Sequence, residues 1–254
     1  MPAAETGDNG RARFRCSYAR PIRIVLLHGF AATSFTWRNV VGPLHAYGPV
    51  HALDRNWVPL PATVDSTVAQ LQTLGDDEVV LIGHSAGAEV AALIAARRAV
   101  PVAALVLESP VVGTGPPAIA RMFARLPVGA VAPAMLRSAI RVGMGPALRR
   151  VWVETSTLTP ATVEGYRRPL LQPGVTEAMW KMTAAAAPVP LDWGRLATMP
   201  CLVIRGMRDR WTTPVPLTHA TTIAYDRCGH VPHEEQSHRF VSDVADFLEQ
   251  RIVR

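Results

Sequence analysis

A serine stands between two glycines in the run Gly83-His84-Ser85-Ala86-Gly87. A short apolar stretch, Val79–Ile82, comes before it, and an alanine-rich helical pattern follows. A serine at such a strand-to-helix turn has a strained backbone, needs small neighbours, and exposes its hydroxyl beside the positive end of a helix. This spacing predicts that Ser85 is a nucleophile.

A serine nucleophile needs a base that takes its proton and an acid that orients the base. Two later segments could supply these groups. His230 lies on a loop directly after Gly229, and Asp209 lies in the loop that leaves the apolar run Cys201–Ile204. We therefore predict that Ser85 attacks, His230 carries the proton and Asp209 orients the imidazole.

The order of these three residues and the run His28-Gly29-Phe30-Ala31 resemble the α/β-hydrolase superfamily, in particular its small capped serine esterases and carbon–carbon hydrolases. The resemblance covers the chain from about residue 20 to the end. It implies an oxyanion hole formed by the backbone N–H groups of Phe30 and Ala86.

One segment departs from the pattern of that superfamily. Asp54 leads into Arg55-Asn56-Trp57-Val58-Pro59-Leu60-Pro61, where relatives often have a glycine-rich turn. Because prolines stiffen this loop, we expect Trp57 and its neighbours to line the mouth of the substrate pocket differently from the glycine-rich turn of the relatives.

Each role has a rival in the sequence. Glu108 ends another apolar run and is an alternative acid; otherwise it would hold an arginine of the following segment or tune His230. His233 is an alternative base. The spacing from Gly206 favours Asp209 as the acid, and the preceding glycine favours His230 as the base.

Apolar runs alternate with helical patterns along the chain, which predicts an α/β fold. We expect the α/β-hydrolase fold, a mostly parallel, doubly wound sheet with an inserted helical cap. The apolar runs are Ile22–Leu27, Val50–Leu53, Val79–Ile82, Val102–Leu107, Cys201–Ile204 and Thr222–Tyr225. The helical patterns are Thr36–Tyr47, Val64–Leu74, Ala86–Arg98, Pro214–Ala220 and Glu234–Ile252. Residues 1–20 are expected to form a flexible tail with an edge strand.

The alternation stops near residue 110 and resumes near residue 200. We predict that residues 110–190 form the cap and that residues 21–109 and 191–254 form the core. The cap segment is rich in methionine, which adapts to irregular apolar shapes, so an apolar pocket under the cap is plausible. Packing of the cap on the core is the simpler explanation for most of the apolar side chains in this segment. The candidate pocket residues in the cap are Met122, Phe123, Met135, Trp152 and Trp180.

The net charge of +6 belongs to the same segment, where eight arginines and Lys181 stand against three glutamates. Solvated helix faces are the simpler interpretation. A positive field could also attract an anionic substrate or a membrane surface. No nucleic-acid-binding motif accompanies the charge, so we expect no nucleic acid partner.

Three cysteines suggest no disulfide framework, and the first twenty residues hold no apolar signal region, so we expect a cytoplasmic protein. No dinucleotide, phosphate or metal-binding spacing is present, so we expect no cofactor and no metal.

These features predict a serine hydrolase that cleaves a carboxylic ester, lactone or thioester with an apolar acyl part, so we expect a small-molecule substrate. The resemblance leaves two alternatives open. Relatives with the same triad cleave carbon–carbon bonds or act as lyases and cyclases, and other homologues bind ligands as receptors.

Overall fold

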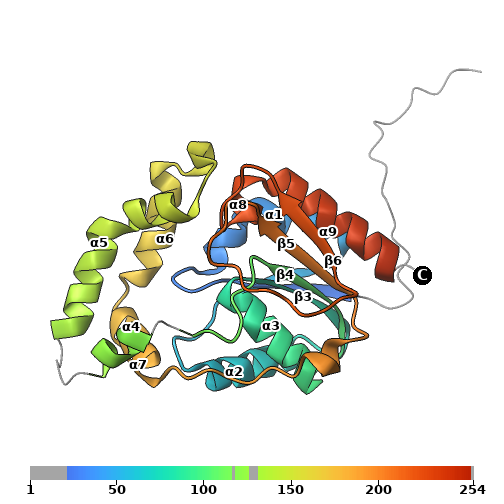
Figure 1. Ribbon diagram of the computed structural model, residues 1–254, viewed down its shortest axis with the longest axis horizontal. Helices are drawn as coiled ribbons and strands as arrows, with labels where there is room; N and C mark the ends of the chain where they lie inside the picture. The colour runs from blue at the N-terminus through green and yellow to red at the C-terminus, as the bar shows by residue number, and fades with distance from the viewer. Residues whose placement is uncertain (1–21, 116–117, 126–130, 253–254) are drawn as a thin grey trace, which may run out of the picture.

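The computed structural model describes residues 22–115, 118–125 and 131–252 (Figure 1). The tail and edge strand expected over residues 1–20 therefore lie outside the described residues. None of the helices in the described ranges is both long enough and apolar enough to cross a membrane.

Within the described residues, six parallel strands form one sheet in the order β2-β1-β3-β4-β5-β6. The strands are β1 (Ile22–Leu27), β2 (Val50–Leu53), β3 (Glu78–His84), β4 (Val102–Glu108), β5 (Cys201–Gly206) and β6 (Thr221–Tyr225). Each contains the apolar run that predicted it. The chain order reverses beside β1, and the carboxyl ends of strands at such a switch point commonly form ligand sites.

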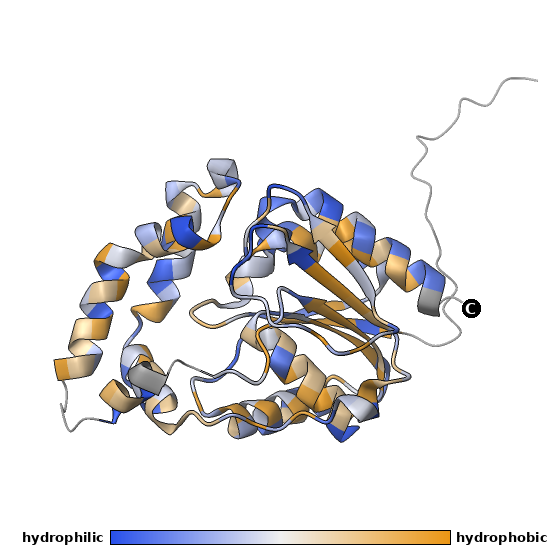
Figure 2. Ribbon diagram, in the orientation of Figure 1, coloured by the Kyte–Doolittle hydropathy of each residue, from blue (hydrophilic) through white to orange (hydrophobic). Residues whose placement is uncertain are grey.

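Helices cover both faces of the sheet, which confirms the doubly wound architecture (Figure 1). One face carries α1 (Arg38–Leu44) and α9 (Ser237–Ile252), and the other carries α2 (Leu60–Thr73) and α3 (Ala86–Arg97). Because successive side chains of a strand point to opposite faces, both faces of β1 and β3 are buried. The strands are accordingly hydrophobic along their length (Figure 2).

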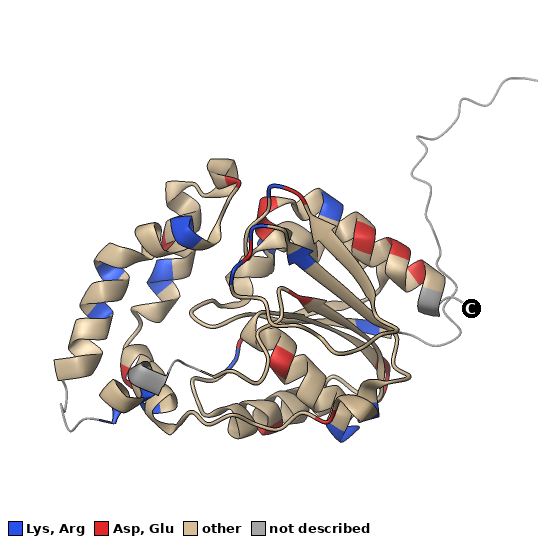
Figure 3. Cartoon of the chain, viewed as in Figure 1, with Lys and Arg blue, Asp and Glu red and all other residues tan. Residues whose placement is uncertain are grey.

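Among the described residues between β4 and β5 there are four α-helices, and we call residues 118–185 the cap. They are α4 (Ala118–Ala124), α5 (Val131–Val151), α6 (Pro160–Leu170) and α7 (Val175–Ala185). Arginines occur along α5, and two more, Arg167 and Arg168, lie in the last turn of α6 (Figure 3). One of them, Arg167, pairs with Glu164 on its own helix.

Three helical predictions need correction. Residues 34–47 are divided into 3-10 helix η1 (Ser34–Trp37), α1, and 3-10 helix η2 (His45–Tyr47). The C-terminal helix is split into α8 (Pro232–Glu235) and α9, with Gln236 outside helical geometry between them.

The predicted helix over Pro214–Ala220 is wrong, since this segment has no regular structure. Pro214 and Pro216 lack an N–H, and a proline also disfavours the helical conformation of the residue before it. The remaining short helices are the 3-10 helices η3 (Thr155–Thr157) and η4 (Trp193–Leu196).

Candidate active site

Ser85 connects β3 to α3 with a φ of 54° and a ψ of −120°, which few residues other than glycine adopt. Its neighbours must be small. A Cβ atom on Gly83 would lie 2.4 Å from the Gly87 carbonyl oxygen, and one on Gly87 would lie 2.1 Å from the Leu27 carbonyl oxygen. The tight turn presents the hydroxyl at the carboxyl edge of the sheet.

Three side chains from distant loops meet at this edge. The Ser85 Oγ lies 3.0 Å from His230 Nε2, and His230 Nδ1 lies 2.8 Å from Asp209 Oδ2. A carboxylate only accepts hydrogen bonds, so Nδ1 carries the proton and Nε2 is left to accept the serine proton. The arrangement can therefore remove a proton from Ser85 as its oxygen attacks.

Asp209 is held as a carboxylate by its own loop. The Trp211 N–H donates to Asp209 Oδ1 at 2.8 Å, and the Thr212 hydroxyl donates to Oδ2. Burial alone would raise the pKa of Asp209, but hydrogen bonds from His230, Thr212 and Trp211 outweigh it and lower the pKa to about 2. Thr212 was not predicted as a site residue; a hydroxyl three residues after the acid was the available signal.

His84, the last residue of β3, supports the loop that carries His230. Its Nε2 donates to the His230 carbonyl oxygen at 2.8 Å, and its buried Nδ1 has no hydrogen-bond partner among the described residues. Burial lowers the pKa of His84 to about 3, so the ring is neutral.

The His28-Gly29-Phe30 loop passes beside Ser85. A Cβ atom on Gly29 would lie 3.1 Å from the Ser85 Cβ. The His28 ring accepts the Arg55 N–H at 3.1 Å, and burial, followed by the charge of Arg55, lowers its pKa to about 3. Ala86 is the first residue of α3, so its N–H has no acceptor within the helix, and the Phe30 N–H finds no acceptor among the described residues.

Among the described residues, Glu108 is hydrogen-bonded to His233 and not to His230. Its carboxyl group lies 2.7 Å from His233 Nδ1 and also accepts the His233 backbone N–H at 2.7 Å. It therefore neither contacts a cap arginine nor bonds to His230. His233 is likewise turned away from Ser85, since its Nε2 bonds to the Thr36 hydroxyl at 2.6 Å. The physical reason is that Glu108 and His233 are fully buried and satisfy one another.

A buried chain of hydrogen bonds runs from this pair to the cap. Tyr166 on α6 donates to the Glu234 carboxylate at 2.9 Å, so its oxygen must accept from Thr36. Thr36 then has no proton left for His233, and the His233 Nε2 must donate to it. With Nε2 protonated, Glu108 and His233 Nδ1 share one further proton. Burial raises the pKa of Glu108 to about 7 and lowers that of His233 to about 3, which agrees with a neutral pair.

An apolar cluster lies beside the Ser85–His230 pair. It joins cap side chains to Ala32, in the loop after β1, and to Val231, next to His230. Trp57 packs against this cluster and meets the Phe30 ring edge-on at 6.2 Å. Trp152 is buried within it, with its Nε1 atom bonded to Thr157, so it fills the interior of the cap.

The other candidate pocket residues lie outside this cluster. Met122, Phe123 and Met135 have more than half of their side-chain surface exposed, and Trp180 is half-buried. Their contact with a substrate stays a prediction.

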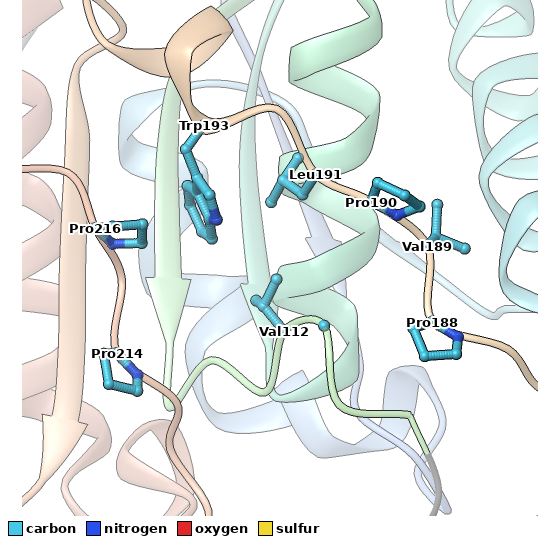
Figure 4. A pocket seen from close by; sticks show the side chains of 9 residues that line it. Val112, Pro188, Val189, Pro190, Leu191, Trp193, Pro214 and Pro216 are labelled. Carbon is cyan, nitrogen blue, oxygen red and sulfur yellow. The ribbon is translucent and has the colours of Figure 1, made fainter.

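A separate apolar groove of about 360 Å³ adjoins the site (Figure 4). It is lined by Val112, Gly113, Pro188, Val189, Pro190, Leu191, Trp193, Pro214 and Pro216. The Val112 N–H is bonded to the Thr213 hydroxyl, so this groove lies along the loop that follows Asp209. Ser85, His230 and Asp209 are not among the residues that line it.

A profile of the Alpha/beta hydrolase family matches residues 24–244 of the chain. Lipase LipV of Mycobacterium tuberculosis (strain ATCC 25618 / H37Rv) is 37% identical over 101 residues, which cover 36% of this chain and only 38% of the lipase. Among solved structures, epoxide hydrolase CorEH is 19% identical with a TM-score of 0.71, covering 92% of this chain and 93% of that chain. A thermophilic esterase from Thermogutta terrifontis is 20% identical with a TM-score of 0.71, covering 92% of both chains.

The profile match spans most of the chain, and the solved structures share its fold. The chain belongs to the alpha/beta hydrolase family.

Proposed function

We propose that the protein is a serine hydrolase that cleaves a carboxylic ester, lactone or thioester with an apolar acyl part. The observation that carries the proposal is the continuous hydrogen-bonded line from Ser85 through His230 to Asp209, with separations of 3.0 and 2.8 Å. A half-buried serine at a strained turn, a histidine and an ionised acid together are what acyl transfer requires.

The reaction proceeds in two steps. Ser85 Oγ attacks the carbonyl carbon while His230 Nε2 takes its proton, and the N–H groups of Phe30 and Ala86 stabilise the oxyanion. His230 then protonates the leaving alcohol or thiol, and the carbon–oxygen or carbon–sulfur bond breaks to leave an acyl-Ser85 ester. Water, activated by the same imidazole, releases the acid and restores Ser85.

The preference for an apolar acyl part rests on the cluster beside the site. Val231 adjoins the proposed base, and Ala32 and Trp57 connect the oxyanion loop with the apolar interior of the cap. An apolar chain placed against these side chains would gain about 0.8 kcal/mol for each CH₂ group that it buries. The similarity to a lipase also supports a preference for an apolar acyl part.

A p-nitrophenyl ester series of increasing acyl length tests this function. We expect turnover whose kcat/KM rises with chain length until the apolar surface is covered. Ser85→Ala should abolish turnover. Ser109→Ala is the matched control, since that serine is fully buried and its hydroxyl has no hydrogen-bond partner in the described part of the chain. Equal ester turnover by wild type and Ser85→Ala would refute the proposal.

A further inference from the structure

Glu235 is a buried carboxylate that accepts hydrogen bonds from four backbone N–H groups. It closes α8 and is 5% exposed. Its two oxygens accept four N–H groups, two on each. Among the described residues no cation pairs with it, in contrast to its neighbour Glu234, which pairs with Arg38 at 2.6 Å. The four N–H groups are therefore what compensates its burial.

One oxygen of Glu235 holds the loop on both sides of His230. Oε1 accepts the Gly229 N–H at 2.9 Å and the Val231 N–H at 3.4 Å. The backbone just before and just after the imidazole is thus tied to a single rigid point on α8.

The other oxygen holds the base of the cap. Oε2 accepts the N–H groups of Val153 and Glu154, each at 2.8 Å, directly after α5 ends. The two sides also touch without Glu235, because the His230 N–H donates to the Val151 carbonyl oxygen at 2.8 Å. A Cβ atom on Gly229 would lie 2.2 Å from that same oxygen, so a side chain there would force the two segments apart.

We propose that Glu235 is a positioning residue that joins the histidine loop to the end of α5, so that the imidazole of His230 and the base of the cap keep one relative position. This role rests on the proposed function of His230. Misplacing a catalytic group by about 1 Å can cost about 100-fold in rate. The hydrogen bonds of Glu235 can therefore affect the rate through the position of His230, although Glu235 touches no substrate.

Glu235→Gln tests the role with minimal change of shape. Glutamine keeps one acceptor oxygen but turns an NH₂ group toward two backbone N–H groups, so either the histidine side or the cap side loses its bonds. We expect kcat for ester turnover to fall about 30-fold or more with KM within about threefold, and Ser85 labelling by a fluorophosphonate to slow in parallel.

Glu234→Gln is the matched control, because it makes the same change in the adjacent buried glutamate, whose carboxylate bonds to Arg38, Asn39 and Tyr166 and not to the histidine loop. We expect its kcat to stay within about threefold of wild type. Thermal unfolding of both variants corrects each rate for the folded fraction. Equal corrected kcat values for the two variants would overturn the positioning role.

Glu235→Ala with added sodium formate covers the case in which the glutamine variant does not fold. Formate fits the space of the missing carboxylate and should restore part of kcat, whereas equimolar sodium chloride should not. If formate only increases the folded fraction of Glu235→Ala, and the kcat of each folded Glu235→Ala molecule equals that of wild type, the positioning role is also overturned. If wild-type Ser85 is neither labelled nor active, the proposed function itself fails, which is a separate result.

Discussion

Glu108 and His233 share one proton across the 2.7 Å between Glu108 Oε2 and His233 Nδ1. This second acid–histidine pair lies beneath the Ser85 site: the His233 ring meets the His84 ring at 5.1 Å, and His84 in turn holds the His230 carbonyl oxygen. The pair is therefore structural support for the site, and the two acid–histidine pairs should respond differently to the same substitution.

Glu108→Gln should leave both stability and activity nearly unchanged. The glutamine oxygen can accept the His233 backbone N–H, and its NH₂ group can donate to Nδ1, so the neutral pair is reproduced. We expect the free energy of unfolding, measured by urea denaturation, to change by less than about 1 kcal/mol. Glu108→Ala removes both bonds and should cost about 3 kcal/mol. A loss of 3 kcal/mol in the glutamine variant would show that the native pair is ionised.

Asp209→Asn should behave in the opposite way. An amide NH₂ group facing His230 Nδ1 favours the tautomer that places the proton on Nε2, where it cannot accept the proton of Ser85. We expect kcat for ester turnover to fall by about 10⁴-fold while stability changes little. A Glu108→Gln variant with the larger kinetic loss would reverse the assignment of the acid.

The fold was largely predictable from sequence, because buried parallel strands read as continuous apolar runs. Val50–Leu53 and Ile22–Leu27 match their strands residue for residue. The pattern around Ser85 also carried its own local signal, since only small neighbours allow the turn. The failed helix at Pro214–Ala220 had a local warning in its two prolines, Pro214 and Pro216.

The supports around the site were not predictable in the same way. Glu108 and His233 are 125 residues apart, and nothing local marks them as partners. His233, Glu234 and Glu235 look like the solvated start of a helix, yet all three are buried. Their partners are set by the packing of the cap and α8 on the sheet, which is a tertiary property.

Stability should fall as the pH is lowered below the ordinary pKa of histidine. Burial lowers the folded-state pKa of His28 and His84 to about 3, whereas each binds a proton in the unfolded chain below 6.5. The unfolded state then holds about two more protons than the folded state, because the Glu108–His233 pair carries one proton in both states between pH 4.5 and 6.5.

Through His28 and His84, the free energy of unfolding should keep its full value above pH 6.5 and lose about 2.7 kcal/mol per pH unit between pH 5.5 and 4.5. Urea denaturation at pH 7.5, 5.5 and 4.5 measures it. A constant free energy over this range would contradict the burial of the two histidines in neutral form.

Gly87→Ala should destabilise the protein severely, because the new methyl group meets the Leu27 carbonyl oxygen at 2.1 Å and backbone cannot move aside cheaply. We expect a loss of about 3 kcal/mol or more in the free energy of unfolding. Gly143→Ala is the control: it lies inside α5 with no atom within 4 Å of the added methyl group, so it should stabilise by about 0.5 to 1 kcal/mol. Equal thermal midpoints for the two variants would contradict the tight turn.

The identity of the nucleophile is tested most directly by fluorophosphonate labelling followed by mass spectrometric mapping of the modified peptide. A single adduct on Ser85 is expected, absent in Ser85→Ala and formed much more slowly in His230→Ala. An adduct on another residue, or labelling of Ser85→Ala at the wild-type rate, would contradict the assignment of Ser85 as the nucleophile.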